Sequence, residues 1–257
     1  MVDLLLRRRS MMTVGGGSPY IVFADPAVEA ICVANWSTDG VGLTQADAAA
    51  VTSIGTVFKS NTSITSFNEL DYFTHVTEIP VDAFNGCTAL TEITLPPSLT
   101  TVRTGAFSGA SSLATVHFNG PGNFYVMNRA FRGCPVSTFP TLSINQIQDS
   151  YAFYGNELTY IELPANLSSI GSRAFIYIGA AKDVVVVERR TTPPSLGNVQ
   201  VFYRDSGGGS FYINTQLKIY VPYSADHSIL NAYKTTGNWT VYANYIFELD
   251  QNGNIPT

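Results

Sequence analysis

The stretch NWSTDGVGLTQADAAAV, residues 35–51, carries oxygen-bearing side chains at the spacing of a calcium-binding loop. If Gly40 takes the sixth position of such a loop, positions 1, 3 and 5 are Asn35, Ser37 and Asp39. Position 12, where a working loop has a bidentate Glu, is then Ala46, and the frame built on Gly42 also lacks an acid there. A single clear acidic ligand supplies too little charge to hold calcium, so the sequence predicts no metal site.

The residues on both sides of this loop instead predict two short helices. FADPAVEAICVANW (23–36) has Asp25 in the N-cap position and Pro26 in the first helical position. Its apolar face consists of Val28, Ile31, Cys32 and Trp36. TQADAAAV (44–51) has Thr44 as N-cap and Asp47 three residues later, which is the spacing of a capping box. We therefore expect Asp47 to bind a backbone amide, and the loop to be a turn between two helices.

The composition of the 257-residue chain excludes several classes of protein. A net charge of -5 and only 13% charged residues leave no basic surface large enough for nucleic acid. No run reaches the ~18 to 20 apolar residues needed to cross a bilayer. Cys32, Cys87 and Cys134 lack CxxC spacing, so neither a zinc site nor a disulfide framework is predicted. The abundance of Thr, Ser and Asn among the polar residues favours strands and turns.

A repeat organises the middle of the chain. The dipeptide Ala-Phe recurs with its alanine at positions 83, 106, 130, 152 and 174, at intervals of 23, 24, 22 and 22 residues. A strand-like motif keeps step with it: LTEITLP from Leu90, LATVHF from Leu113, VSTFP from Val136 and LTYIELP from Leu158. One such unit cannot bury its apolar side alone, whereas stacked units share a continuous core. The repeat therefore predicts a solenoid.

Within a unit, the alternation of side chains predicts which residues face the core. In LTEITLP the inward residues are Leu90, Ile93 and Leu95. Glu92 and Thr94 then face outward, and the glycine after each Ala-Phe pair permits a sharp turn. Cys87 and Cys134 follow that glycine in two units, where we expect each thiol to pack as a small buried apolar group.

These units resemble the BspA-type leucine-rich repeats of bacterial surface proteins, over roughly residues 62–247. The resemblance implies an α+β solenoid, a right-handed superhelix with a parallel sheet on its concave face. TTPPSLGNVQVF resembles a degenerate unit, and the segment from LKIYVP to the NW turn resembles a C-terminal cap made of a strand and a helix. The stretch 35–47 resembles an EF-hand or dockerin-like loop, found ahead of some repeats of this family, that has lost its ligands.

Two stretches depart from the repeat. RDSGGGSFYINTQ interrupts the C-terminal cap, and its glycines predict a flexible surface loop. The third unit, VSTFPTLSINQIQDSYAF, lacks the usual LPxxLTxIG, so its loop or curvature is expected to differ. The predicted organisation is a basic arm and Gly-rich linker (1–18), a helical N-terminal cap (19–61), the repeat array (62–216) and a C-terminal cap (217–257).

No combination of residues in the chain predicts catalysis. There is no GxSxG, HExxH, P-loop or dinucleotide-binding motif. His75, His117 and His227 lie in three different parts of the chain, with no Cys, Ser or carboxylate shown to converge on any of them. We expect no enzyme activity and no cofactor.

The outward residues of successive strands are the candidate binding residues. They are Glu92, Thr94, Thr115, His117, Tyr160 and Glu162, and Thr138, Lys218 and Tyr220 continue the same ladder. A polar and aromatic strip suits a protein or glycan ligand, because Tyr supplies rigid contact area with a polar tip. A solvated sheet face would also be rich in Thr, so that alternative stays open.

Two settings fit a non-enzymatic repeat protein of this kind. The resemblance implies a secreted or cell-surface bacterial adhesin. In MVDLLLRRRSMM, however, the leucines precede the arginines, which is the reverse of a secretory signal. A structural or receptor-binding component of a bacteriophage particle, docked through Arg7, Arg8 and Arg9, needs no such signal. Neither setting requires nucleic acid or a membrane span.

Overall fold

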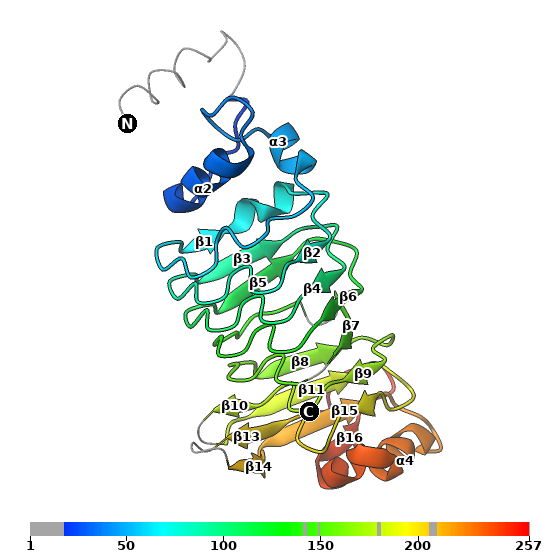
Figure 1. Cartoon of the computed structure of the whole chain (residues 1–257). Coiled ribbons are helices and arrows are strands. Elements are labelled where there is room, and N and C mark those ends of the chain that lie inside the picture. The colour runs from blue at the N-terminus through cyan, green and yellow to red at the C-terminus, as the bar shows by residue number, and fades with distance from the viewer. Residues whose placement is uncertain (1–17, 141–142, 149, 179–180, 206–209, 257) are drawn as a thin grey trace.

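The computed structural model describes residues 18–140, 143–148, 150–178, 181–205 and 210–256, and it is a stack of strands and turns with helices at both ends (Figure 1). Helices α2 (Pro26–Trp36) and α3 (Gln45–Ala50) lie at the N-terminal end, followed by a 3-10 helix (Asn68–Tyr72). Helix α4 (Ser228–Thr235) and a second 3-10 helix (Gly237–Tyr245) lie at the C-terminal end. Arg7, Arg8 and Arg9 fall outside the described residues.

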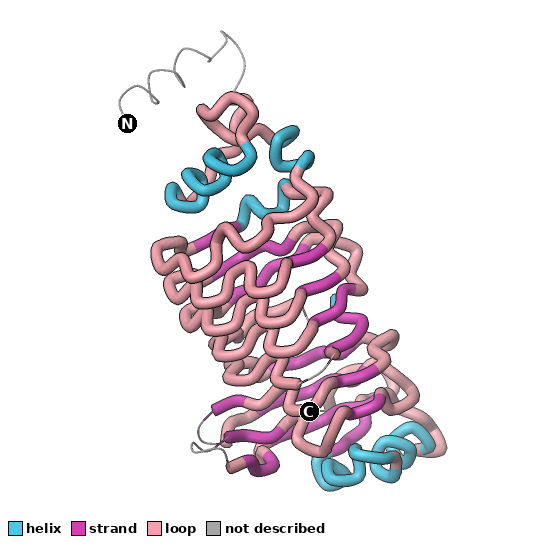
Figure 2. The backbone as a smooth tube through the Cα atoms, viewed as in Figure 1, coloured by secondary structure: helices cyan, strands magenta, loops and turns pink. Residues whose placement is uncertain are grey.

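The strands form parallel sheets on two sides of the stack, and most connections between them are turns and loops (Figure 2). One side has two sheets: β1 (Ser66–Phe67), β3 (Glu92–Leu95) and β5 (Thr115–Phe118), then β8 (Tyr160–Leu163), β11 (Val184–Glu188), β15 (Leu217–Val221) and β16 (Ile246–Glu248). The other side has one sheet of β2 (Glu78–Ile79), β4 (Thr101–Val102), β6 (Phe124–Val126), β7 (Ile144–Ile147), β9 (Ser169–Ile170) and β12 (Ser195–Leu196). This arrangement confirms the predicted repeat fold with parallel strands; the handedness of the superhelix stays a prediction.

A column of phenylalanine rings runs through the stack. Its members are Phe58, Phe84, Phe107, Phe131, Phe153, Phe175 and Phe202. Neighbouring ring centroids are 4.9 to 5.7 Å apart, and the rings are tilted by only 1 to 17°. Because this spacing is close to the ~4.8 Å between paired strands, one ring fits each layer without distorting either sheet.

Two of these seven layers are absent from the Ala-Phe pattern. Phe58 and Phe202 follow Val57 and Val201, so valine takes the place of the small residue at both ends of the column. The alanines of the interior layers are fully buried; of the two valines, Val57 is 39% exposed and Val201 is fully buried. The dipeptide therefore marks the interior layers and misses the terminal ones.

The stretch RDSGGGSFYINTQ, predicted as a flexible surface loop, contributes paired strand residues on both sides of its glycines. Residues 206–209 lie outside the described residues. Strand β13 (Tyr203–Asp205) pairs antiparallel with β14 (Phe211–Ile213), and β13 also pairs in parallel with β10 (Tyr177–Ile178). The aromatic and β-branched residues on both sides of the glycines favour strands, although the glycine run by itself favours a loop.

The third unit differs from the others, as its sequence predicts. On the first side of the stack its only described pairing is an isolated bridge between Thr115 and Thr138, so the sheet ends at β5 and starts again at β8. On the second side the pairing of β6 with β7 has a register shift between Phe124 and Tyr125.

The two predicted helices near the N-terminal end are confirmed, with Asp25 and Thr44 as their N-cap residues. The Asp25 carboxylate accepts hydrogen bonds from the amides of Ala27 (2.7 Å) and Val28 (3.4 Å), and the Thr44–Asp47 capping box is present. The second Asp25 oxygen accepts from the amide and hydroxyl of Thr65, at 2.5 and 2.8 Å, just before β1. Burial raises the pKa of Asp25, but these hydrogen bonds outweigh it and the pKa is lowered. One carboxylate thus joins helix α2 to the first strand.

Glu188 is an exception to the apolar interior at the C-terminal end. Its side chain is fully buried, and neither carboxylate oxygen has a hydrogen-bond partner among the described residues. Burial raises its pKa to about 8, and the charge of Arg190 offsets only part of that effect. Strand β11 therefore carries a carboxyl group that is protonated at neutral pH.

This buried carboxyl predicts a loss of stability with rising pH. Unfolded Glu ionises near pH 4.5, whereas folded Glu188 keeps its proton up to about pH 8, so the free energy of unfolding falls between these values. We expect the wild-type chain to lose a few kcal/mol more than Glu188→Gln between pH 5 and pH 8, at about 1.4 kcal/mol for each pKa unit. Urea unfolding at a series of pH values measures this difference. Parallel pH profiles for the two proteins would contradict the assignment.

Candidate functional site

The carboxylates of the calcium-like loop, residues 35–47, accept hydrogen bonds from other groups of the protein. One Asp39 oxygen accepts a hydrogen bond from the Tyr20 hydroxyl (2.6 Å), and the other accepts from the Ser37 hydroxyl (3.0 Å) and the Val41 amide (2.8 Å). The Tyr20 hydrogen bond is the main reason that the pKa of Asp39 falls to about 2. Asp47 accepts from both the amide and the hydroxyl of Thr44. Within the described residues no group of three His, Cys, Asp or Glu side chains could hold a metal ion.

Sequence reasoning missed the role of Tyr20 in this loop. Tyr20 forms an isolated antiparallel bridge with Thr44, and its ring lies against Gly42. A Cβ atom at position 42 would come within 2.5 Å of the Tyr20 ring, so glycine is required there for the ring to pack. Gly40 therefore adopts the positive φ of the turn, and Gly42 leaves space for the Tyr20 ring. The resemblance to an EF-hand or dockerin loop has no further support.

The six candidate binding residues lie on one side of the stack, on what we call the Leu-strand face: the outward side chains of β3, β5, β8, β11, β15 and β16. They divide into two groups, because β5 and β8 belong to different sheets. Glu92 pairs with Thr115 and Thr94 pairs with His117 across β3 and β5. Tyr160 and Glu162 belong to β8 and the second sheet. The continuous ladder expected from the sequence is therefore interrupted at the third unit.

The first group is polar and internally bonded. Asn68 donates to the Glu92 carboxylate (2.8 Å) and accepts from the Thr94 hydroxyl (3.0 Å). Thr94 is only 7% exposed, so its hydroxyl is less available to a ligand than its outward register predicts. His117 is exposed and forms no hydrogen bond with the described residues. These four side chains present a small polar surface with one free imidazole.

The second group is more apolar than the sequence predicts, because β11 inserts two valines into it. Tyr160, Val185 and Lys218 form one rung across β8, β11 and β15. Glu162, Val187, Tyr220 and Phe247 form the next rung, which extends to β16. Val187, Tyr220 and Leu249 make a small buried cluster of their own on this face. The unbroken run VVVV is typical of a buried strand and was the available signal for β11.

Exposed aromatic rings flank this cluster. Tyr160 is 49% exposed and Phe247 is 44% exposed, although both lie on a regular sheet. Beside Tyr160, Arg189 donates its Nε to Glu162 (2.6 Å) and forms an ion pair with it. The C-terminal half of the Leu-strand face thus combines apolar contact area with a fixed charge pair, which is the composition of a binding surface.

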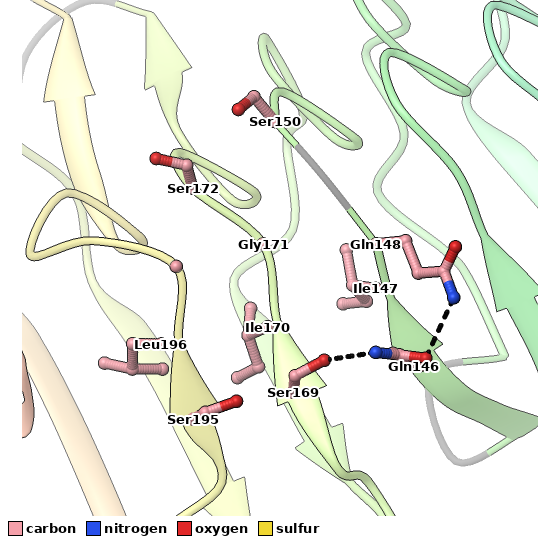
Figure 3. A pocket seen from close by; sticks show the side chains of 11 residues that line it. Gln146, Ile147, Gln148, Ser150, Ser169, Ile170, Gly171, Ser172, Ser195 and Leu196 are labelled. Carbon is pink, nitrogen blue, oxygen red and sulfur yellow. Dashed lines mark hydrogen bonds between the residues drawn. The ribbon is translucent and has the colours of Figure 1, made fainter.

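A polar groove opens on the opposite side of the stack, between β7, β9 and β12 (Figure 3). Its volume is about 480 Å³. Gln148 donates to Gln146 (3.0 Å), which donates in turn to the Ser169 hydroxyl (2.7 Å). The described residues that line it are hydroxyl, amide, glycine and aliphatic residues, without a charged group or a nucleophile paired with a base. This groove can hold neutral polar groups but contains no catalytic combination.

Two histidines and two cysteines form hydrogen bonds with neighbouring groups of the protein. His75 is bonded to the carbonyl of Ala49 (2.5 Å) and His227 to Glu248 (2.5 Å). Cys87 and Cys134 are buried, as predicted, and donate to the carbonyls of Phe58 and Phe107, each at 3.0 Å. Burial raises the pKa of Cys87 to about 11 and that of Cys134 to about 12, so both stay unreactive thiols.

Comparison with known proteins agrees with this geometry. Residues 52–180 match the family model described as BspA type Leucine rich repeat region, in six copies. Among solved structures, a leucine-rich repeat protein from Bacteroides ovatus is similar, with 24% identity and a TM-score of 0.42 over 58% of this chain. The match spans 35% of that protein, about a third of its length. No curated protein matches the chain. Within the described part, no helix is both long and apolar enough to cross a membrane.

The occupied carboxylates of the N-terminal loop predict indifference to calcium. We expect the melting temperature to change by less than about one degree between millimolar calcium and excess chelator, because a ligand stabilises the folded state only if it binds that state. Differential scanning calorimetry measures this, with magnesium as the control ion. A calcium-dependent rise that disappears in Asp39→Asn would show that the loop binds the ion after all.

Proposed function

The chain belongs to the BspA-type leucine-rich repeat family, and from this premise we propose that it is a non-enzymatic binding protein of the adhesion type, whose Leu-strand face recognises a protein or glycan ligand. The observation that carries the proposal is the pair of exposed rings, Tyr160 and Phe247, on either side of the Val187–Tyr220–Leu249 cluster. Rings in this position supply large apolar contact area at little cost in conformational entropy.

The surroundings of the two rings support the same proposal. Lys218 is exposed in the rung that contains Tyr160, and the Glu162–Arg189 pair lies beside that rung. Polar and charged groups around an apolar centre are the usual anatomy of a protein interface. The polar group at Glu92, Thr115 and His117 lies on the same side of the stack and would extend the contact toward the N-terminal end.

Replacing the two rings should remove binding without unfolding the chain. Tyr160→Ser with Phe247→Ser is expected to weaken binding of labelled protein to intact bacterial cells roughly tenfold or more, as for central aromatic residues of interfaces. Flow cytometry measures the binding. Pretreatment of the cells with protease or with periodate separates a protein ligand from a glycan.

The matched control is Val22→Ser with Val81→Ser, since these side chains are 84% and 53% exposed and lie before α2 and just after β2 of the opposite sheet. Equal binding by both double variants and the wild type, to every strain tested, would overturn the proposal.

The setting of this binding role is a separate part of the proposal. We place the chain on a bacteriophage particle, attached through the arm that contains Arg7, Arg8 and Arg9, with a bacterial cell-surface adhesin as the alternative. The support for attachment is the run of three arginines in an otherwise acidic chain. Membership of the family favours a surface role in either case.

An antibody against the chain distinguishes the two settings. We expect the protein in purified phage particles, and expect deletion of residues 1–17 to release it from them. Detection on the outer membrane of intact cells would instead favour the adhesin. Detection in the cytosol alone would contradict both.

A further inference from the structure

A second surface lies on the side of the stack where the Ala-Phe turns follow one another. The residue before each alanine forms a vertical column: Asp82, Gly105, Arg129, Tyr151 and Arg173. Backbone hydrogen bonds hold the column in register, since the amide of Arg129 donates to the carbonyl of Ser150 (3.1 Å) and that of Tyr151 to Ser172 (3.0 Å). The residue after each phenylalanine forms a neighbouring column: Asn85, Ser108, Arg132, Tyr154 and Ile176.

The chemistry of these two columns changes along the stack. The first two layers carry acidic, small or amide side chains, and Asp82 is already paired with Lys59 (2.9 Å). In the next three layers these two columns carry arginine and tyrosine, apart from Ile176, which is fully buried. We call the side chains of Arg129, Arg132, Tyr151, Tyr154 and Arg173 the Arg–Tyr cluster.

Ring contacts hold two of the three arginines of this cluster, Arg132 and Arg173, in place. The Arg173 guanidinium lies 5.4 Å from the Tyr151 ring and 4.6 Å from the Phe211 ring, and it donates to the Tyr151 hydroxyl. Its Nε also donates to Gln200 (2.6 Å). The Arg132 guanidinium lies 5.8 Å from the Tyr154 ring, and the two tyrosine rings meet edge to face at 5.5 Å. Guanidinium groups fixed in this way lose little conformational entropy when they bind an anion.

The positive charge of the cluster is not neutralised by the described residues. Lys59, Arg103, Lys182 and Arg189 each form an ion pair with a carboxylate. Arg129, Arg132 and Arg173 form none within the described part, and Arg129 and Arg132 are exposed. The acid beside the cluster is Asp205, which is 5% exposed and accepts a hydrogen bond from the Tyr154 hydroxyl (2.7 Å). In a chain of net charge -5, this is a local concentration of unpaired cations.

We propose that the Arg–Tyr cluster is a binding site for an acidic polysaccharide, at a position distinct from the Leu-strand face. Arginine binds carboxylate and sulfate groups through two parallel hydrogen bonds, and Arg129 and Arg132 offer two such forks within one layer. The half-buried rings of Tyr151 and Tyr154 lie between the arginine layers, where they offer apolar area to the sugar rings between successive anionic groups.

A polysaccharide fits this surface better than a nucleic acid does. The cluster spans three layers, which is on the order of 10 Å at the ~4.8 Å strand spacing. A duplex carries one charge per ~1.7 Å and needs a long basic track, whereas the rest of this chain is acidic and repels it. A sugar chain with one anionic group per residue or per disaccharide needs only two or three cations.

The test uses the full-length chain and two defined polyanions. We expect it to bind polygalacturonate (carboxylate only) or dextran sulfate (sulfate only) at about 50 mM salt, with affinity falling as salt is raised, and not to bind neutral dextran. Arg129→Gln with Arg132→Gln should weaken binding tenfold or more, because roughly two charge-assisted contacts are lost. Biolayer interferometry measures the affinities, and the two polysaccharides separate carboxylate from sulfate preference.

The matched control is Arg103→Gln with Lys234→Gln, which removes the same charge at other places and should leave binding within about twofold. Tyr160→Ser with Phe247→Ser should also leave polyanion binding unchanged. The proposal for the Arg–Tyr cluster can therefore hold even if the proposal for the Leu-strand face fails. Three results would overturn the proposal: no binding of either polyanion, an equal loss in both charge variants, or tighter binding of single-stranded DNA of the same length.

Discussion

The stack depends on one constraint: each layer must place a phenylalanine ring flat against the next at about the spacing of hydrogen-bonded strands. Ring separations of 4.9 to 5.7 Å along the column satisfy both the aromatic contacts and the sheets. The alanine beside each interior ring and the sharp turn after it follow from this requirement, because the chain must return to the next strand within the same thickness. Within each sheet, an outward side chain then lies one layer above its counterpart.

Much of the fold could be predicted because the recurring Ala-Phe dipeptide marks the layers directly in the sequence. The spacing of Ala-Phe located five layers, and the caps at Asp25 and Thr44 located both N-terminal helices. What could not be predicted depends on tertiary partners. Val57 and Val201 replace alanine in the two end layers of the ring column, and β11 has a valine run in place of the leucine motif. The hairpin of β13 and β14 was hidden by the glycine run between its strands.

The candidate binding residues show the same limit at the level of side chains. Strand alternation correctly placed Glu92, Thr115 and Tyr160 outward, since that depends on local geometry alone. It could not show that Asn68 takes up the hydroxyl of Thr94, because Asn68 lies in the preceding layer. Nor could it show that the aromatic half of the face is separated from the polar half, since that break arises from the irregular third unit. The position of a residue along its strand decides which way its side chain points, whereas the neighbouring side chains decide whether its polar groups are available to a ligand.

The column that precedes the alanines has a consequence for how this protein can change. Asp82, Arg129, Tyr151 and Arg173 adopt φ angles of 54 to 65°, and Gly105 adopts 66° in the same column. A residue with a side chain pays roughly 1 kcal/mol or more to adopt this left-handed conformation, and glycine does not. Glycine is therefore compatible with the turn, and the arginines and the tyrosine lower the stability of the folded chain relative to glycine at the same positions. Drift under selection for stability alone would erode these side chains first, so their persistence in relatives would be a direct measure of selection on that surface.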